Sequence, residues 1–164
     1  MGCFNAELCE KFRKTCKAYN NNIWLADRVG EDWRTIKYGE ALTIVDSLAQ
    51  SMVDMGLNQS RGVMILSENS INHGLVNVAA LSAGIPLSPI SVAYSMMSSD
   101  YAKLKHCFDL VAPGMIYVEN GMQFEKALDN LNLNNVHVVC SNNPSKNIKM
   151  KLFNDLISTT PSDA

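Results

Sequence analysis

Two kinds of segment are missing from this sequence: an apolar run of the roughly 18 residues that span a bilayer, and the apolar core of an N-terminal signal peptide. The five cysteines, Cys3, Cys9, Cys16, Cys107 and Cys140, include no C-x-x-C pair, which argues against a disulfide framework and a zinc site. A formal net charge of -2 gives no attraction for phosphate backbones. We therefore expect a cytoplasmic protein whose partners include neither a membrane nor a nucleic acid.

Familiar catalytic and nucleotide-binding motifs are absent as well. The sequence contains neither G-x-G-x-x-G nor G-x-x-x-x-G-K, the glycine-rich turns that wrap phosphates. The three histidines, His73, His106 and His137, are not accompanied by a serine or cysteine nucleophile pattern. We expect these histidines to pack against neighbours or face solvent, and we assign no catalytic or metal-binding residue.

The residues that are present indicate a globular chain. Hydrophobic residues make up 47% and charged residues 18%, and 164 residues suit one α/β domain, residues 1–164. Apolar spacing predicts a helix over 7–19, a β-hairpin from 23–28 and 33–38, and a helix over 41–53 that stops at Gly56. Strands over 62–66, 86–90, 115–118 and 136–140 then alternate with helices over 71–83, 99–110, 122–131 and around 150–157. This alternation predicts a largely parallel sheet flanked by helices.

One loop in this pattern is a candidate ligand contact. Gly84 and Pro86 end the preceding helix and direct the chain into the 86–90 strand. Ser91, Tyr94 and Ser95 then follow the carboxyl end of that strand, the side on which open α/β sheets bind ligands. These three residues are the ligand-side loop that the sequence predicts.

Four segments in order carry a resemblance to a known family. They are YGEAL at 38–42, the run LSENSINHGLVNVAALSAGIPLSPISVAYS at 66–95, the AGIPLSP segment within it at 83–89, and DYAKLKHCFDLVAPGMIYV at 100–118. The chain resembles the N-terminal portion of adenylate-forming (AMP-binding) acyl-CoA synthetases. The AYS at 93–95 and KLK at 103–105 are similar to the feruloyl-CoA synthetase-like branch.

The resemblance implies a reaction, but this sequence lacks the phosphate loop that the reaction uses in the family. Such ligases use ATP and Mg²⁺ to convert a carboxylic acid to an acyl-AMP, and then pass the acyl group to coenzyme A. Their phosphate loop is rich in Ser, Thr and Gly and ends in Pro-Lys, whereas the nearest candidate here, Ser158-Thr159-Thr160-Pro161, has no glycine and no following lysine. We therefore expect no cofactor for this chain alone.

Two hypotheses about function follow. The first is that the chain is the first α/β subdomain of such a ligase, inactive alone, whose partner is the missing remainder of the enzyme or a second copy through an exposed apolar face. The alternative is a stand-alone, non-catalytic binding or interaction domain with the same fold. In either case Lys37 replaces the Ser or Thr that caps the following helix in the family.

Overall fold

The computed structural model describes residues 3–162, with side chains from residue 7 onward, so the Cys3 side chain lies outside the described residues. The helices are α1 (Cys3–Ala18), α2 (Tyr38–Asp54), α3 (Ile71–Ser82), α4 (Ala93–Met96), α5 (Ala102–Val111), α6 (Gly121–Leu128) and α7 (Phe153–Leu156). The strands are β1 (Ile23–Val29), β2 (Asp32–Lys37), β3 (Val63–Ile65), β4 (Leu87–Pro89), β5 (Met115–Asn120), β6 (His137–Asn142) and β7 (Lys151–Leu152). In this range no helix has the length and hydrophobicity needed to cross a bilayer.

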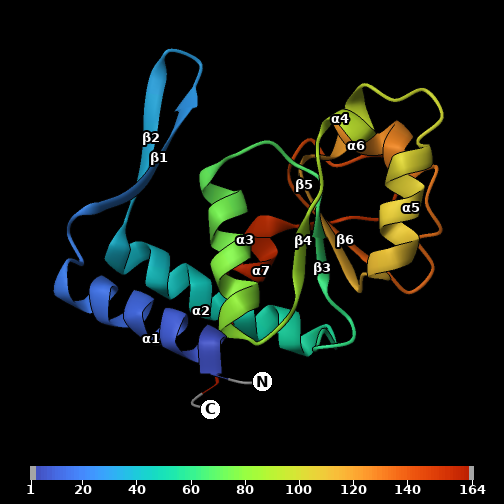
Figure 1. The fold of residues 1–164 in the computed structure, drawn as a ribbon. Helices are drawn as coiled ribbons and strands as arrows, with labels where there is room; N and C mark the ends of the chain where they lie inside the picture. The colour runs from blue at the N-terminus through green and yellow to red at the C-terminus, as the bar shows by residue number, and fades with distance from the viewer. Residues whose placement is uncertain (1–2, 163–164) are drawn as a thin grey trace.

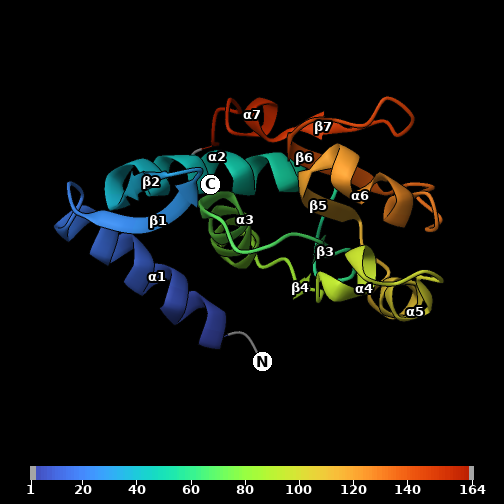
Figure 2. The same ribbon diagram turned by 90° about the horizontal axis from the view of Figure 1, so that it is seen from above.

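The main sheet has five strands in the order β4-β3-β5-β6-β7, and every neighbouring pair is parallel. Helices α2, α3 and α7 lie on one side of it, and α4, α5 and α6 lie on the other (Figures 1 and 2). A separate antiparallel pair, β1-β2, forms the N-terminal hairpin. The α/β fold expected from the sequence, with its parallel sheet, N-terminal helix and hairpin, is confirmed.

Successive side chains of the central strands point alternately into two separate hydrophobic cores. On β3, Val63 and Ile65 join the core under α2 and α3, while Met64 joins the core under α5 and α6. On β5, Tyr117 joins the core under α2 and α3, and Ile116 joins the core under α5 and α6. Because successive side chains on a strand point to opposite faces, a strand buried on both faces is apolar throughout.

The hairpin projects away from the sheet above the N-terminal end of α2 (Figure 1). Its base is fixed by Trp24, whose ring lies 5.2 Å from the ring of Phe12 on α1. Leu25 fits against α3 at Gly74, where an added Cβ would lie 2.7 Å from the leucine side chain. Further along, Val29 and Trp33 are more than 60% exposed. The hairpin is therefore anchored at one end and open to solvent at the other.

Local chemistry explains where the predicted helices begin and end. The Ser70 hydroxyl accepts a hydrogen bond from the His73 backbone N–H, so Ser70 is the N-cap of α3. Lys37 stands at the N-cap of α2 in extended conformation, and its side chain makes no capping bond. Gly56 and Gly84 follow α2 and α3 with φ of +77° and +67°, a conformation that favours glycine.

Two helix predictions were wrong in detail. Instead of one helix around 150–157, the chain adds β7 to the sheet edge before the single turn of α7. The helix predicted over 99–110 begins at Ala102, because Ser98 and Asp100 form a turn that accepts the backbone N–H groups of Tyr101 and Ala102. The short helix α4 was not predicted, since four residues are too few to establish a helical period.

Candidate functional site at the carboxyl edge of the sheet

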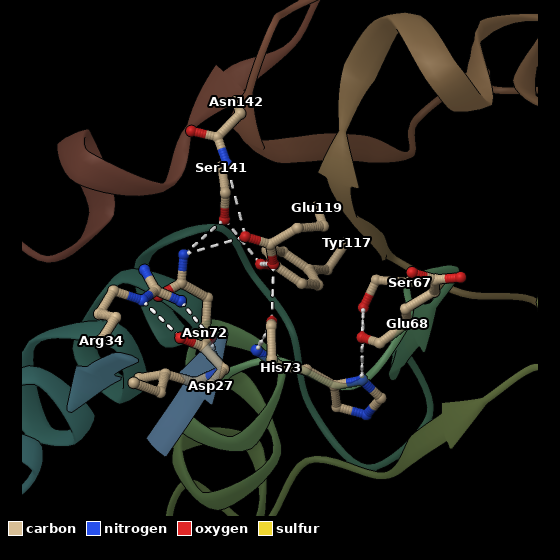
Figure 3. Close-up of polar contacts among 12 residues, drawn as sticks. Asp27, Arg34, Ser67, Glu68, Asn72, His73, Tyr117, Glu119, Ser141 and Asn142 are labelled. Carbon is tan, nitrogen blue, oxygen red and sulfur yellow. Dashed lines mark hydrogen bonds and ion pairs between the residues drawn. The ribbon is translucent and has the colours of Figure 1, made fainter. Parts of the chain in front are cut away.

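Polar side chains gather where β3, β5 and β6 end, where α3 begins and where the hairpin contacts the start of α3 (Figure 3). We call this group the carboxyl-edge cluster. It comprises Asp27, Arg34, Ser67, Glu68, Ser70, Asn72, His73, Tyr117, Glu119, Ser141 and Asn142. The carboxyl ends of parallel strands are where open α/β sheets bind ligands, so this is the candidate site that the fold defines.

A directed chain of hydrogen bonds runs through the centre of the cluster (Figure 3). The Asn72 amide donates to the Ser141 hydroxyl at 2.9 Å, and the hydroxyls of Ser141 and Tyr117 are 2.6 Å apart. The Tyr117 hydroxyl donates its only proton to the Glu119 carboxylate at 2.5 Å. Ser141 must therefore donate to Tyr117, and the chain has a single direction that ends at Glu119.

Burial keeps the proton on Tyr117. The side chain is fully buried, and its ring packs 6.1 Å from the ring of Phe153 on α7. Desolvation raises the pKa of Tyr117 far above its ordinary value, and the neighbouring Glu119 carboxylate raises it further. The tyrosine hydroxyl is therefore a permanent donor to Glu119 and not a proton carrier.

The two oxygens of the Glu119 carboxylate differ in their surroundings. Oε2 accepts short hydrogen bonds from Tyr117, at 2.5 Å, and from the Ser70 hydroxyl, at 2.8 Å. Oε1 has only long contacts, at 3.5 Å, with the amides of Asn72 and Asn142. Oε1 is accordingly the oxygen with room for a closer donor from a bound molecule.

An ion pair ties the hairpin to the start of α3. The Arg34 guanidinium donates to both Asp27 oxygens, at 2.9 Å from Nε and 2.5 Å from Nη2. The Asp27 carboxylate also accepts the backbone N–H of Ile71, the first residue of α3, at 2.8 Å. Arg34 holds the pKa of Asp27 below its usual value, with a further contribution from Ile71. A carboxylate at a helix N-terminus is also favoured by the helix dipole.

Ser67 and His73 form the remaining contact of the cluster. The Ser67 hydroxyl lies 3.3 Å from Nδ1 of His73 and donates to the Glu68 carbonyl at 3.0 Å. The same histidine nitrogen lies 3.2 Å from that carbonyl, which accepts a hydrogen bond from it. Both side chains therefore bind the backbone just after β3. This arrangement is typical of a histidine with a structural role and not of a histidine that activates a serine nucleophile.

Two hollows open on either side of Arg34. One, of 600 Å³, lies between the hairpin and the ends of β3 and β5, and its walls include Asp27, Glu68 and Glu119. The other, of 370 Å³, lies between β2, α2 and α7 and includes Asn72 and Ser141. Their volumes fall in the range of small-molecule sites. Polar groups from the carboxyl-edge cluster therefore line both hollows.

The cluster does not fit a nucleotide phosphate or a metal ion. The backbone N–H groups of Ile71 and His73, which open the N-terminus of α3, are already bound by Asp27 and Ser70. Within residues 3–162, no group of three or more His, Cys, Asp or Glu side chains is placed to hold a metal. ATP phosphates and Mg²⁺ would need ligands from outside the carboxyl-edge cluster.

The structure places the ligand-side loop of the sequence prediction after β4, at the same edge of the sheet as this cluster but outside its hydrogen bonds. Ser91 is exposed after β4, Tyr94 is half-buried on α4 with the Lys103 ammonium 5.4 Å from its ring centre, and Ser95 is buried. The Ser95 hydroxyl has no hydrogen-bond partner among the described residues. A ligand role for the three residues stays a prediction.

Sequence reasoning missed the residues at the centre of the cluster. Tyr117 and Glu119 are two apart on β5, which places them on one face, and Ser141 and Asn142 end the neighbouring strand β6. A polar residue that follows an apolar strand by one or two positions is the signal that would have found them. Asp27 and Arg34 gave no such signal, because hairpin pairing alone brings them together.

The fold and the edge cluster define an α/β protein with polar side chains gathered at the carboxyl end of a parallel sheet. Residues 12–155 match the profile of the family described as AMP-binding enzyme. The chain therefore belongs to the AMP-binding enzyme family.

Individual relatives are longer than this chain. Long-chain-fatty-acid–CoA ligase ACSBG2 of Xenopus laevis is 27% identical over 117 residues, which are 71% of this chain and 15% of the ligase. The luciferase-like enzyme of the mealworm Zophobas morio superposes with a TM-score of 0.72 at 18% identity, over 94% of this chain and 34% of the enzyme. A benzoate CoA ligase of Burkholderia xenovorans gives a TM-score of 0.73 at 13% identity, over 94% and 29%. The two structures show a shared fold.

Proposed function

We propose that this chain supplies the first α/β layer of an AMP-binding acyl- or aryl-CoA ligase and that it does not form acyl-AMP alone. The observation that carries the proposal is the family match over 12–155 in a chain that spans 15% of the ligase relative. The absence of a phosphate loop from the 164 residues supports the second part. So do the occupied N–H groups at the start of α3.

The ligase class proposed here activates an aryl carboxylate of the feruloyl or cinnamic type. The AYS and KLK segments support that branch, and they place Tyr94 and Lys103 together in a cation–π contact. Ser91, Tyr94 and Ser95 would then face the acid. A long-chain fatty acid, the substrate named for the Xenopus relative, is the competing class.

The proposed partner is the remainder of the ligase, which would cover the hairpin. Trp33 is 63% exposed and Val29 61%, although both lie in a strand pair whose base is well packed. Arg28 lies over the Trp33 ring at 5.4 Å, which keeps that side chain in a defined position. Exposed large apolar residues that gather on one element are typical of a surface that a neighbour covers.

Acyl-AMP formation tests the catalytic part of the proposal. The purified chain is incubated with ATP, Mg²⁺, labelled pyrophosphate and ferulate, benzoate or a long-chain fatty acid, and label entering ATP is counted. We expect no exchange above the enzyme-free control. Exchange with any acid by the 164-residue chain would overturn the proposal.

Transcript sequencing past the codon for Ala164 tests the ligase part. A frame that continues into a Ser/Thr/Gly-rich loop ending in Pro-Lys supports the proposal, and the longer protein should then exchange with ferulate in preference to a fatty acid. The opposite preference would contradict the feruloyl branch but would remain consistent with the ligase proposal.

Self-association of the 164-residue chain distinguishes the proposal from the stand-alone interaction domain. We expect concentration-dependent association in size-exclusion chromatography that Trp33→Lys reduces, because the change places a charge on the exposed hairpin. Tyr19→Lys, at an exposed residue after α1, is the matched control. A stop codon after Ala164 together with a dye-silent monomer would instead favour the stand-alone domain.

A further inference from the structure

A further cavity lies at the opposite, amino edge of the sheet. It has a volume of 470 Å³, and we call it the basic cavity. Its walls are Leu133, Val136, His137, Val138, Ile148, Lys149 and Lys151. His137 and Lys151 are the first residues of β6 and β7, whereas the carboxyl-edge cluster uses Ser141 and Asn142 at the other end of β6. The two sites are therefore separated by the length of the strand.

Apolar side chains form the floor of the basic cavity. Val138 is buried in the core under α5 and α6, and Leu133, Val136 and Ile148 pack against that core while remaining half-exposed. The four side chains come from β6 and from the two loops on either side of it. The volume falls in the range of small-molecule sites, whose walls are mainly apolar with a few charged or polar groups.

The charged groups of the cavity are all basic. Lys149 and Lys151 are exposed, and within the described part of the chain neither forms an ion pair. The acids near Lys151 are Asp54 and Asp155, and they line a separate hollow of 270 Å³ on its other side. The basic cavity itself therefore carries two ammonium groups and no carboxylate.

His137 is a half-buried wall of the cavity, bonded to the backbone at one ring nitrogen. Its Nε2 lies 3.3 Å from the Met55 carbonyl, which requires a proton on that nitrogen. Burial lowers the pKa of His137, and the nearby charges of Lys151 and Arg61 lower it further. Arg61 is held in place by a hydrogen bond to the Asn135 carbonyl. The imidazole is accordingly neutral at pH 7, and a bound anion would make its protonation easier.

We infer that the basic cavity binds a small anion that carries a hydrocarbon body. The body lies on Val136, Val138 and Ile148, and the charged head lies between Lys149 and Lys151. Charge complementarity selects the head group, and the volume selects a small molecule over a protein segment. The inference rests on the amino edge of the sheet alone, so it stands or falls independently of the proposed ligase function.

The test is a titration of the full 164-residue chain with octane-1-sulfonate, followed by amide and histidine NMR shifts. A sulfonate stays ionised over the whole pH range, so any pH dependence reports the protein. Octan-1-ol supplies the same body without charge, and inorganic sulfate supplies charge without a body. The variants are Lys149→Gln with Lys151→Gln, and the matched control is Lys146→Gln in the same loop, which is exposed and outside the cavity.

We expect octane-1-sulfonate to shift the amides of residues 133–138 and 148–151, and to raise the pKa of His137. The double lysine variant should bind roughly tenfold more weakly, which lies within the limit of about 25-fold for two exposed charges that each contribute up to about fivefold in affinity. Lys146→Gln should bind like the parent chain. Lys149 and Lys151 are exposed and form no ion pair among the residues that the structure describes, so their replacement should leave the fold intact.

Three results would overturn the inference. The first is equal binding of octan-1-ol, which would show that the lysines select no anion. The second is the same shift pattern with inorganic sulfate, because the apolar floor would then contribute nothing. The third is a set of shifts centred on the exposed hairpin or unchanged in the double variant, since either places the ligand elsewhere.

Discussion

The hydroxyl of Tyr117 donates a hydrogen bond of 2.5 Å to the carboxylate of Glu119, two residues further along β5. The same hydroxyl accepts from Ser141 on β6, so one buried atom links two strands of the sheet at their carboxyl ends. The position of Glu119 therefore depends on a side chain whose ring belongs to the hydrophobic core.

Replacing Tyr117 with Phe should destabilise the chain by about 1–3 kcal/mol. The change keeps the packing against Phe153 but leaves the Ser141 hydroxyl without its acceptor and removes a donor from Glu119. The free energy of unfolding from urea denaturation measures this. Tyr19→Phe removes a hydroxyl from a tyrosine that is 57% exposed and should cost less than about 0.5 kcal/mol. Equal losses in the two variants would show that the hydrogen-bond chain adds nothing.

The link between the hairpin and α3 predicts a pH dependence. Asp27 has a lowered pKa in the folded chain, so its contribution to stability is complete above the unfolded value near 3.8 and is lost as pH falls through the lower folded value. Asp27→Asn should therefore be less stable than the parent chain at pH 7, and the difference should shrink below about pH 4. Urea denaturation at a series of pH values measures it.

Asp32→Asn is the control for the Asp27 experiment. It removes a carboxylate from the same hairpin, and Asp32 forms no ion pair within the described residues. Its stability difference from the parent chain should be small at every pH. A difference for Asp27→Asn that is constant from pH 7 to pH 3 would contradict the ion-pair explanation.

The uncapped start of α2 offers a stabilising substitution. Lys37→Thr should raise the melting temperature by about 2–4 °C, which corresponds to roughly 1 kcal/mol. Threonine would cap the backbone N–H of Glu40, the Glu40 side chain would reach back in a capping box, and a positive charge would leave the helix N-terminus. Thermal unfolding followed by circular dichroism measures the change.

A reverse substitution checks the capping argument. Asn120 caps α6 by accepting the Gln123 backbone N–H at 3.2 Å, so Asn120→Ala should lower the melting temperature by a comparable amount. An unchanged or lower melting temperature for Lys37→Thr, with the expected loss for Asn120→Ala, would mean that the α2 cap is satisfied in another way.

The close approach of β3 and β4 explains the glycine at position 62. A Cβ at Gly62 would lie 2.5 Å from the Pro86 carbonyl oxygen, and a backbone atom cannot move without separating the strands. Gly62→Ala should therefore cost about 1–3 kcal/mol in unfolding free energy. At Gly74 the obstacle is the end of the Leu25 side chain, and alanine favours the helix by about 1 kcal/mol, so Gly74→Ala should cost less. The opposite ranking would contradict this reading of the contacts.

Most of the fold could be predicted because its signals are local. Apolar spacing and turn residues predicted α2, α3, the hairpin and the alternation of strands with helices, and Gly84 follows α3 where a helix stop was expected. The end of the chain was harder. Strand β7 has two residues, Lys151 and Leu152. They form a strand because they pair with the neighbouring strand β6, and this pairing cannot be seen in the local sequence.

The sequence predicted a candidate site at the carboxyl edge of the sheet, from the rule that ligands bind at the carboxyl ends of strands. The hydrogen-bonded cluster nevertheless lies around Glu119 and not around Ser91, Tyr94 and Ser95. Sequence patterns locate the ends of strands but do not tell which polar side chains meet there, because that depends on strand order. Here β5 lies between β3 and β6.

The sequence by itself determined the α/β class, the ends of the main helices and the family resemblance, because each depends on residues close together in the chain. Tertiary structure alone decided the contacts between distant residues. It brought Asp27 to the first N–H of α3, 44 positions away, and joined Asn72 to Ser141 across 69 positions. It also placed Lys149 and Lys151 beside the apolar floor of the basic cavity. Hydrophobic burial fixes the strand order, and the strand order decides which polar groups are neighbours.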